Sequence, residues 1–338
     1  MPTPFPSPFR FTAPPPPKAA TGPTAGVYEQ IGRDFGIQNP PTFVVLSSAP
    51  TLLTAAWALM RESLLAGPGP RTGKELVSAG VSLANRCAFC VDAHTMLLHA
   101  TGDHAAAESL AHGRRPADPG QERLLAWGEA SRTPGSPRLR PLPFPAAQAP
   151  GYVGSALAFH FINRVVSALL TEQLLPGGAQ RLRPVRSLLG RTVAAAVRRE
   201  VEPGLSLPLL HDAQVPGGVP AWAGDTPVGP AYTALRAAAL AGEGLLDREE
   251  ADTVERAVAA WDGGHPPAVG EGVPGRELPG ARLALLAAFA PYRITPEDVG
   301  AWRSAAHTDH CLVHLVAYGA FRAVDRIETA LPMATAAG

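Results

Sequence analysis

The sequence predicts an all-α protein. Three observations lead to this fold class: Ala- and Leu-rich segments of helical length, Gly- and Pro-rich joints between them, and no run of alternating polar and apolar residues bounded by turn signals. The chain has 338 residues, of which 46% are hydrophobic and 17% charged, as in ordinary globular proteins. Its 37 prolines and 34 glycines are too few for a collagen-like or wholly disordered chain.

The N-terminal 25 residues differ from the rest of the chain. They contain nine prolines, including an uninterrupted run at positions 14–17. Such a segment has little to bury and favours extended polyproline conformations. We therefore predict a disordered, mobile tail over residues 1–25.

From residue 26 onward the pattern is helical. The uncharged stretch 38–60 contains Pro40, Pro41 and Pro50, which favour the start of a core helix over a membrane span. A Pro-rich segment at 133–150 predicts a loop. The predicted helices span residues 51–66, 72–84, 87–101, 104–111, 119–131 and 152–175.

The C-terminal part of the chain carries a weak echo of the first. Arg123 begins the tetrapeptide RLLA and Arg282 begins RLAL, and an Ala-Phe pair follows each at a similar separation. Chance could produce such matches in an Ala/Leu/Arg-rich chain, but a fused pair of helical units also would. We predict a catalytic helical domain at 26–200, a linker at 201–229 and a degenerate helical repeat at 230–332. The Arg-rich segment 181–199 is interpreted as a solvated helix face, with an anion site as the alternative.

Charge limits the classes of partner. Twenty-nine basic and 29 acidic residues give a formal net charge of zero, so no overall basic field attracts nucleic acid or a membrane surface. The N-terminus lacks the basic start and apolar run of a secretory signal. We expect a cytoplasmic protein with reduced thiols, without nucleic-acid or membrane partners.

One constellation in the sequence carries chemistry. Cys87 and Cys90 lie three residues apart and His94 follows four residues later, so a helix would place all three on one face. Glu75 lies on the preceding predicted helix and can approach His94 if the chain folds back at Asn85. A helix N-terminus favours thiolate at the first cysteine, and the imidazole can take a proton from the second. A neighbouring thiol can trap an oxidised cysteine as a disulfide.

The motif has three other interpretations: a zinc site, a c-type haem site and a pair of inert thiols. A structural zinc site needs four ligands; the motif supplies three, and His99 or His104 could be the fourth, but the chain has no second CxxC. A c-type haem would need histidine at position 91, which is Val91. The interpretation of both cysteines as inert buried thiols also stays open. We expect neither a metal nor a cofactor.

A second group of histidines lies near the C-terminus. His307, His310 and His314 share one helix face, with Cys311 pointing elsewhere. We interpret this segment as an ordinary half-buried helix and Cys311 as a bystander thiol.

The motif resembles that of the alkyl hydroperoxidase D (AhpD) family, within the carboxymuconolactone decarboxylase-like superfamily. The resemblance rests on Glu75, Cys87, Cys90 and His94 at the family spacing, and covers residues 26–176 well. It implies an all-helical bundle and a peroxidase that reduces organic hydroperoxides or hydrogen peroxide. By the same resemblance Cys90 is the peroxidatic cysteine and Cys87 the resolving one, whereas helix-end electrostatics alone would make Cys87 the more acidic thiol.

The resemblance also implies a dithiol reductant, either a lipoyl group or a thioredoxin-like protein, that reopens the disulfide. The helix with His160 and Asn163 resembles one that follows the motif in related peroxidases, so these two residues are candidates for the peroxide pocket. The second unit lacks the motif, which would make the chain an internal pseudo-dimer and leaves a homo-oligomer open. Two alternatives persist: a decarboxylase-like or biosynthetic enzyme acting on a small organic acid, and a non-enzymatic redox or metal-binding module.

Overall fold

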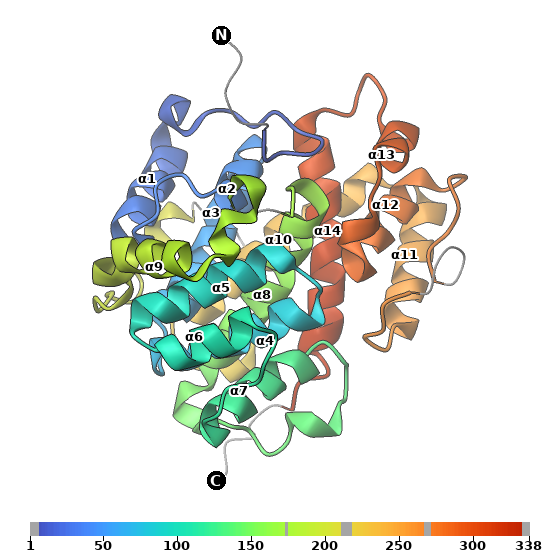
Figure 1. Ribbon diagram of the computed structural model, residues 1–338. Coiled ribbons are helices and arrows are strands. Elements are labelled where there is room, and N and C mark those ends of the chain that lie inside the picture. The colour runs from blue at the N-terminus through green and yellow to red at the C-terminus, as the bar shows by residue number, and fades with distance from the viewer. Residues whose placement is uncertain (1–6, 173–174, 211–217, 267–271, 333–338) are drawn as a thin grey trace.

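The computed structural model describes residues 7–172, 175–210, 218–266 and 272–332. Within these residues the regular structure is helical, apart from one isolated β-bridge between Phe9 and Leu170, so the all-α prediction is confirmed (Figure 1). The α-helices are α1 (Gly22–Gln30), α2 (Pro41–Val44), α3 (Pro50–Met60), α4 (Arg71–Ala84), α5 (Ala88–Thr101), α6 (His104–Ala111), α7 (Pro119–Ala130), α8 (Ala149–Leu169), α9 (Arg183–Val197), α10 (Val228–Leu240), α11 (Arg248–Ala260), α12 (Pro279–Phe289), α13 (Pro296–Trp302) and α14 (Asp309–Glu328).

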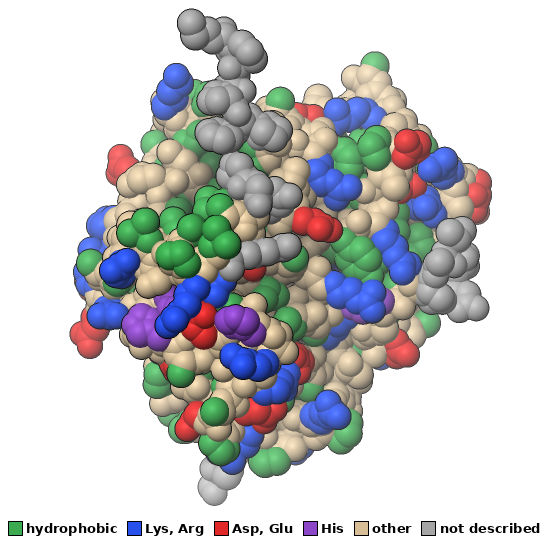
Figure 2. Space-filling model, in the orientation of Figure 1, with side chains coloured by type: hydrophobic (Ala, Val, Ile, Leu, Met, Phe, Trp, Pro, Cys, Tyr) green, Lys and Arg blue, Asp and Glu red, His purple; other side chains and the backbone are tan. Residues whose placement is uncertain are grey.

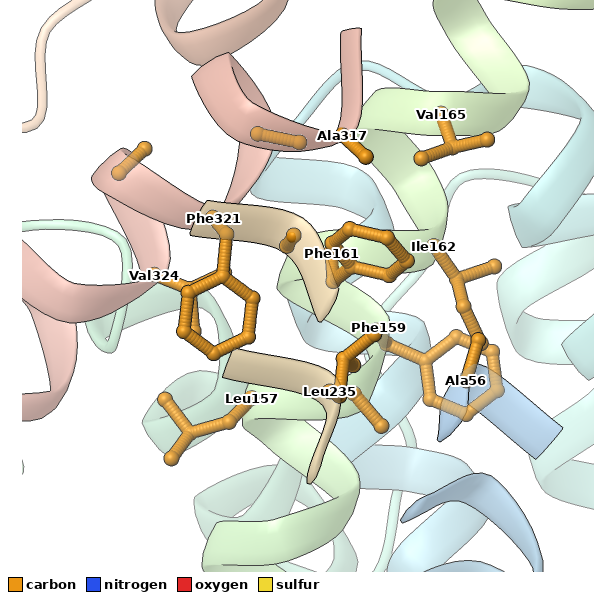
Figure 3. Close-up of a cluster of buried hydrophobic side chains, with 14 of the residues drawn as sticks. Ala56, Leu157, Phe159, Phe161, Ile162, Val165, Leu235, Ala317, Phe321 and Val324 are labelled. Atoms are coloured by element: carbon orange, nitrogen blue, oxygen red, sulfur yellow. The ribbon is translucent and has the colours of Figure 1, made fainter. Parts of the chain in front are cut away.

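Helix α8 is the centre of the molecule. Twenty of its 21 residues are buried, and these include the polar residues Ser155, His160, Asn163 and Arg164. It contacts α3, α4, α10 and α14, so it joins the N-terminal and C-terminal halves. Figure 3 shows the side chains of Phe159, Phe161 and Ile162 on α8 packed among residues of these neighbours. A single hydrophobic core therefore runs through both halves.

Glycines let two pairs of helices pack backbone to backbone. Gly80 of α4 lies against the carbonyl of Leu125 in α7, and Gly128 of α7 lies against the carbonyl of Val77 in α4. In the second half, Gly319 of α14 lies against the carbonyl of Ala284 in α12. The first of these contacts fixes α4, the helix that carries Glu75.

The boundaries of the predicted helices differ from the observed ones by more than three residues in two places. The helix predicted to end at 175 ends at Leu169, because Leu170 turns to extended backbone and pairs with Phe9. The helix predicted over 51–66 ends as an α-helix at Met60 and continues as a π-helical turn, Arg61–Leu65. Buried ion pairs of Arg61 with Asp34 and Glu62 hold that turn.

The Pro-rich N-terminal segment is not a free tail over its described part. The Arg10 guanidinium donates hydrogen bonds to the carbonyl oxygens of Ser167, Ala168 and Ile294, at 2.6–3.2 Å. The Pro15 carbonyl accepts a hydrogen bond from Ser47. Residues 7–20 therefore cross the end of α8 and reach the C-terminal half, in contrast to the predicted disorder. Residues 1–6 of the predicted tail lie outside the described residues.

The Arg-rich segment forms α9, which packs against α5. Its arginines are only partly a solvated face, since Arg186 is buried and paired with Glu108, and Arg199 is paired with Asp34. In the segment predicted as a linker, Gly204 and Ser206 donate hydrogen bonds to the buried carboxylate of Glu62; positions 211–217 of that segment lie outside the described residues. The predicted domain boundaries and the internal repeat stay predictions.

No helix in the described part of the chain is long and apolar enough to cross a membrane. On the face that Figure 2 shows, basic and acidic side chains are interspersed. That distribution agrees with the formal net charge of zero.

The contact between α4 and α7 leads to a stability prediction. Replacing Gly80 with alanine forces the new methyl group into the backbone of α7, and overpacking of this kind costs about 1–3 kcal/mol. We expect Gly80→Ala to lower the midpoint of thermal unfolding measured by circular dichroism. The control is Gly300→Ala, because Gly300 is an exposed helical residue with open space around it. Gly300→Ala should leave the midpoint unchanged or raise it, and an equal loss in both variants would contradict the packing argument.

Candidate active site

The four residues of the sequence motif lie on two consecutive helices. Helix α4 ends at Ala84, Asn85 and Arg86 form a tight turn, and α5 begins at Ala88 with Cys87 as its N-cap residue. Arg86 has a φ of 57°, in the left-handed region that turns the chain back on itself. The two helices pack against each other, so the fold-back predicted at Asn85-Arg86 is observed.

Glu75 and His94 meet across the two helices. Their hydrogen bond joins Nδ1 of His94 to Oε2 of Glu75 at 2.7 Å, and both side chains are buried. The other carboxylate oxygen of Glu75 accepts a hydrogen bond from Nε of Arg71, also at 2.7 Å. Burial opposes ionisation of Glu75, but the Arg71 charge and the bond with His94 outweigh it and lower the pKa of the carboxyl.

The other ring nitrogen of His94 is available for chemistry. A carboxylate partner at Nδ1 fixes that nitrogen as the donor, so Nε2 of the neutral ring carries the lone pair. Nε2 is buried and has no hydrogen-bond partner among the described residues. The Phe159 ring packs edge-on against the imidazole, with 4.3 Å between centroids, and holds its orientation. The ring of His94 is thus held on its Nδ1 side, with Nε2 left without a partner among the described residues.

Cys87 and Cys90 are both buried, with 2% and 3% of their surfaces exposed. Burial works against thiolate formation at Cys87, but hydrogen bonds from the Cys90 thiol, the Ser167 hydroxyl and the Cys90 backbone N–H lower its pKa. At Cys90, burial together with the hydrogen bond and charge of Cys87 raises the pKa. The two thiols therefore shift in opposite directions, with the pKa of Cys87 lowered and that of Cys90 raised, and the hydrogen bond between them contributes to both shifts.

A cavity of about 110 Å³ opens beside Cys90 and His94. Apart from these two residues and Thr42, its lining is apolar and includes Phe89, Met96 and Phe159. One wall comes from the N-terminal segment Phe35–Phe43, which packs over α5. Cys90 is one of the residues that line this cavity, and Cys87 is not.

His160 and Asn163 do not line this cavity. His160 is fully buried, where Ser131 contacts its Nε2 and Asn85 its Nδ1, at 2.8 and 3.1 Å. Asn163 pairs with the hydroxyl of Ser82. The structure thus places the two candidate pocket residues in a polar network behind α4, where their side chains are already satisfied.

The remaining histidines have structural partners. His99 is buried between His104 and Glu108, so it is not available to complete a ligand set with the cysteines. His310 contacts the carbonyl of Ser48, and His307 contacts the carbonyl of Trp302. The described residues contain no group of three or more metal-ligating side chains.

Two parts of the site were missed at the sequence level. Arg71 lies four residues before Glu75 on the same helix, and this spacing could have indicated the ion pair. The cavity wall at 35–43 carries no comparable signal, because its approach to α5 depends on tertiary packing with α9.

Comparison with known proteins agrees with this geometry. The sequence model of the carboxymuconolactone decarboxylase family matches residues 51–116, which include all four motif residues. The chain is also 39% identical over 324 residues to a protein named alkyl hydroperoxide reductase from Mycobacterium tuberculosis, covering 93% of this chain and 92% of the relative. No solved structure matches.

The chain therefore belongs to the carboxymuconolactone decarboxylase family, among its AhpD-like members. It is a homologue of a peroxidase-type enzyme along nearly its whole length.

The opposite pKa shifts of the two cysteines can be measured directly. In a Cys311→Ser background, the ultraviolet absorbance of thiolates reports only on Cys87 and Cys90. Cys90→Ser keeps a hydroxyl donor beside Cys87, so its thiolate should appear at lower pH than in a free cysteine. Cys87→Ser leaves Cys90 buried, so its thiolate should appear only at higher pH. The reverse order of the two titrations would contradict the geometry described for the helix N-terminus.

Proposed function

We propose that this protein is a thiol-dependent peroxidase in which Cys90 is the peroxidatic cysteine, Cys87 the resolving cysteine, and His94 with Glu75 a proton relay. One observation carries the proposal: Cys90 and the unpartnered Nε2 of His94 belong to the same cavity, while Cys87 is hydrogen-bonded to Cys90 outside it. A peroxide in the cavity would meet one sulfur and one proton acceptor. The substrates are organic hydroperoxides or hydrogen peroxide, and the apolar lining suits an alkyl group.

In the first step His94 takes the thiol proton of Cys90 through Nε2. The Cys90 thiolate attacks the terminal oxygen of the hydroperoxide, the O–O bond breaks, and a sulfenic acid forms on Cys90. The proton held by His94 passes to the leaving alkoxide, which departs as an alcohol. Glu75 stabilises the transient imidazolium from the Nδ1 side.

In the second step Cys87 resolves the sulfenic acid. The Cys87 thiolate attacks the Cys90 sulfur, the S–O bond breaks, the hydroxide that leaves takes a proton from solvent to become water, and a Cys87–Cys90 disulfide forms. The lowered pKa of Cys87 suits this role, because the resolving residue must be a thiolate when it attacks. A dithiol, either a lipoyl group or a thioredoxin-like protein, then reduces the disulfide by exchange. Such a cycle needs a reducing compartment such as the cytoplasm.

The central test replaces Cys90 with serine. We expect Cys90→Ser to abolish hydroperoxide consumption followed by stopped-flow, because no sulfur then faces the cavity. Cys311→Ser is the matched control and should retain full turnover, since that residue lies on α14 away from the cavity. Wild-type turnover in Cys90→Ser would disprove the proposed peroxidase.

The proposed proton relay predicts that loss of the Glu75 charge lowers turnover without abolishing it. Glu75→Gln keeps the size of the side chain but removes the charge that stabilises imidazolium on His94, so turnover should fall about 100-fold. Glu108→Gln is the control, because Glu108 also binds a histidine of α5 and an arginine but lies outside the cavity. Peroxide consumption of the two variants is compared at equal folded fraction. Equal losses in both would contradict a specific relay.

A further inference from the structure

The turn that precedes Cys87 is strained and held from outside. Arg86 adopts a left-handed conformation that non-glycine residues rarely take, and the next residue is Cys87. Cys87 itself has non-helical backbone angles, φ −92° and ψ 88°, so its position depends on this turn and not on the regular geometry of α5. Strained backbone of this kind persists only where surrounding contacts enforce it.

Two residues of the C-terminal half contact the turn. Tyr292 accepts a hydrogen bond at its hydroxyl from Nη1 of Arg86, at 3.2 Å. Nε2 of His265 lies 2.9 Å from the carbonyl oxygen of Ala84, and Nδ1 of His265 lies 3.1 Å from the Tyr292 hydroxyl. Three hydrogen bonds thus link Ala84, His265, Tyr292 and Arg86 in that order, and the backbone between Ala84 and Arg86 closes the ring. We call this arrangement the His265–Tyr292 clamp.

The donors and acceptors of the clamp run in one consistent direction. A carbonyl can only accept, so Nε2 of His265 is the protonated nitrogen and donates to Ala84. Burial, with the nearby Arg132 charge, lowers the pKa of His265 to about 4, so the ring is neutral and Nδ1 accepts from the Tyr292 hydroxyl. That hydroxyl in turn accepts from Arg86. Each group in the ring thus makes the bond that its protonation state allows.

The residue between these two anchors is fixed as well. Asn85 is buried, and its Oδ1 accepts a hydrogen bond from Nη1 of Arg132 at 2.6 Å. The Arg132 guanidinium also donates to the carbonyls of Gly263 and Phe289 in the C-terminal half. Both residues of the turn and the preceding Ala84 are therefore tied, directly or through Arg132, to the half of the chain that lacks a CxxC motif.

We propose that Tyr292 and His265 are positioning residues that hold Cys87 in the geometry needed for disulfide formation with Cys90. This inference rests on the proposed function, and it assigns a task to the C-terminal half: it supports the catalytic turn of the first half. Loss of the clamp would let Cys87 drift from Cys90 while leaving the cavity, Cys90 and His94 in place. The resolving step would slow, and the first step would not.

The test uses Tyr292→Phe in the full-length chain, because this change removes one hydroxyl and keeps the ring. After a single peroxide addition, we expect disulfide formation to slow about tenfold, less than the ~100-fold that a 1 Å misplacement can cost. Cys90 should accumulate as sulfinic acid in mass spectrometry, because the unresolved sulfenic acid is oxidised further. His265→Ala should give the same result. In a Cys87→Ser background, Tyr292→Phe should not change the rate of sulfenic acid formation.

The matched control is Tyr232→Phe, whose buried hydroxyl in the C-terminal half has no hydrogen-bond partner among the described residues. It should resolve like the wild type. A second readout needs no peroxide: in glutathione redox buffers, Tyr292→Phe should shift the Cys87–Cys90 pair toward the dithiol. Unchanged resolution and unchanged redox equilibrium in Tyr292→Phe would overturn the inference. A wild-type protein that consumes no peroxide, with the redox shift still present, would overturn the proposed function alone.

Discussion

The buried hydrogen bond between Glu75 and His94 is the constraint on which the site depends. It joins two packed helices, α4 and α5, and both of its side chains are buried. Arg71 balances the buried carboxylate, and the glycine contact with α7 sets the position of α4. Because removal of one partner from a buried pair leaves an uncompensated polar group, the arrangement is stable only when complete. The same bond leaves Nε2 of His94 free in the cavity.

The two halves of the molecule are joined by buried arginines. Arg132 and Arg164 come from the first half and donate to the carbonyls of Phe289 and Ala288, at the C-terminal end of α12. That helix end carries partial negative charge, which suits two guanidinium groups. Burial lowers the pKa of both groups, to about 10 for Arg132. This junction connects the C-terminal half to the turn before Cys87, because Arg132 also donates to Asn85, and it supports the proposed positioning role of that half.

The sequence predicted the fold class, most helices and the motif, because these features depend on local spacing. Cys87, Cys90 and His94 lie within one and a half turns of helix, and the helix-breaking turn at 85–86 brings Glu75 to them. The sequence alone could not predict which side chains line the cavity. His160 and Asn163 lie on the apolar helix suggested by the family resemblance, but their orientation toward Ser131 and Ser82 depends on packing around α8. The ordered segment 7–20 was missed for the same reason, since the partners of Arg10 lie 157 to 284 residues away along the chain.

In the proposed mechanism the two cysteines divide the requirements of a peroxidase between them. Hydrogen bonds from Cys90 and Ser167 lower the pKa of Cys87, yet it is Cys90 that lines the cavity. The lowered pKa of Cys87 and the cavity position of Cys90 would conflict only if a single thiol had to be both the more acidic one and the one that meets the peroxide. A resolving cysteine gains from a standing thiolate, because its attack follows the first step immediately. A peroxidatic cysteine beside a positioned imidazole needs to lose its proton only when peroxide is bound, and a protonated resting state protects it from other oxidants. The raised pKa of Cys90 is therefore compatible with its role, provided that His94 accepts the proton.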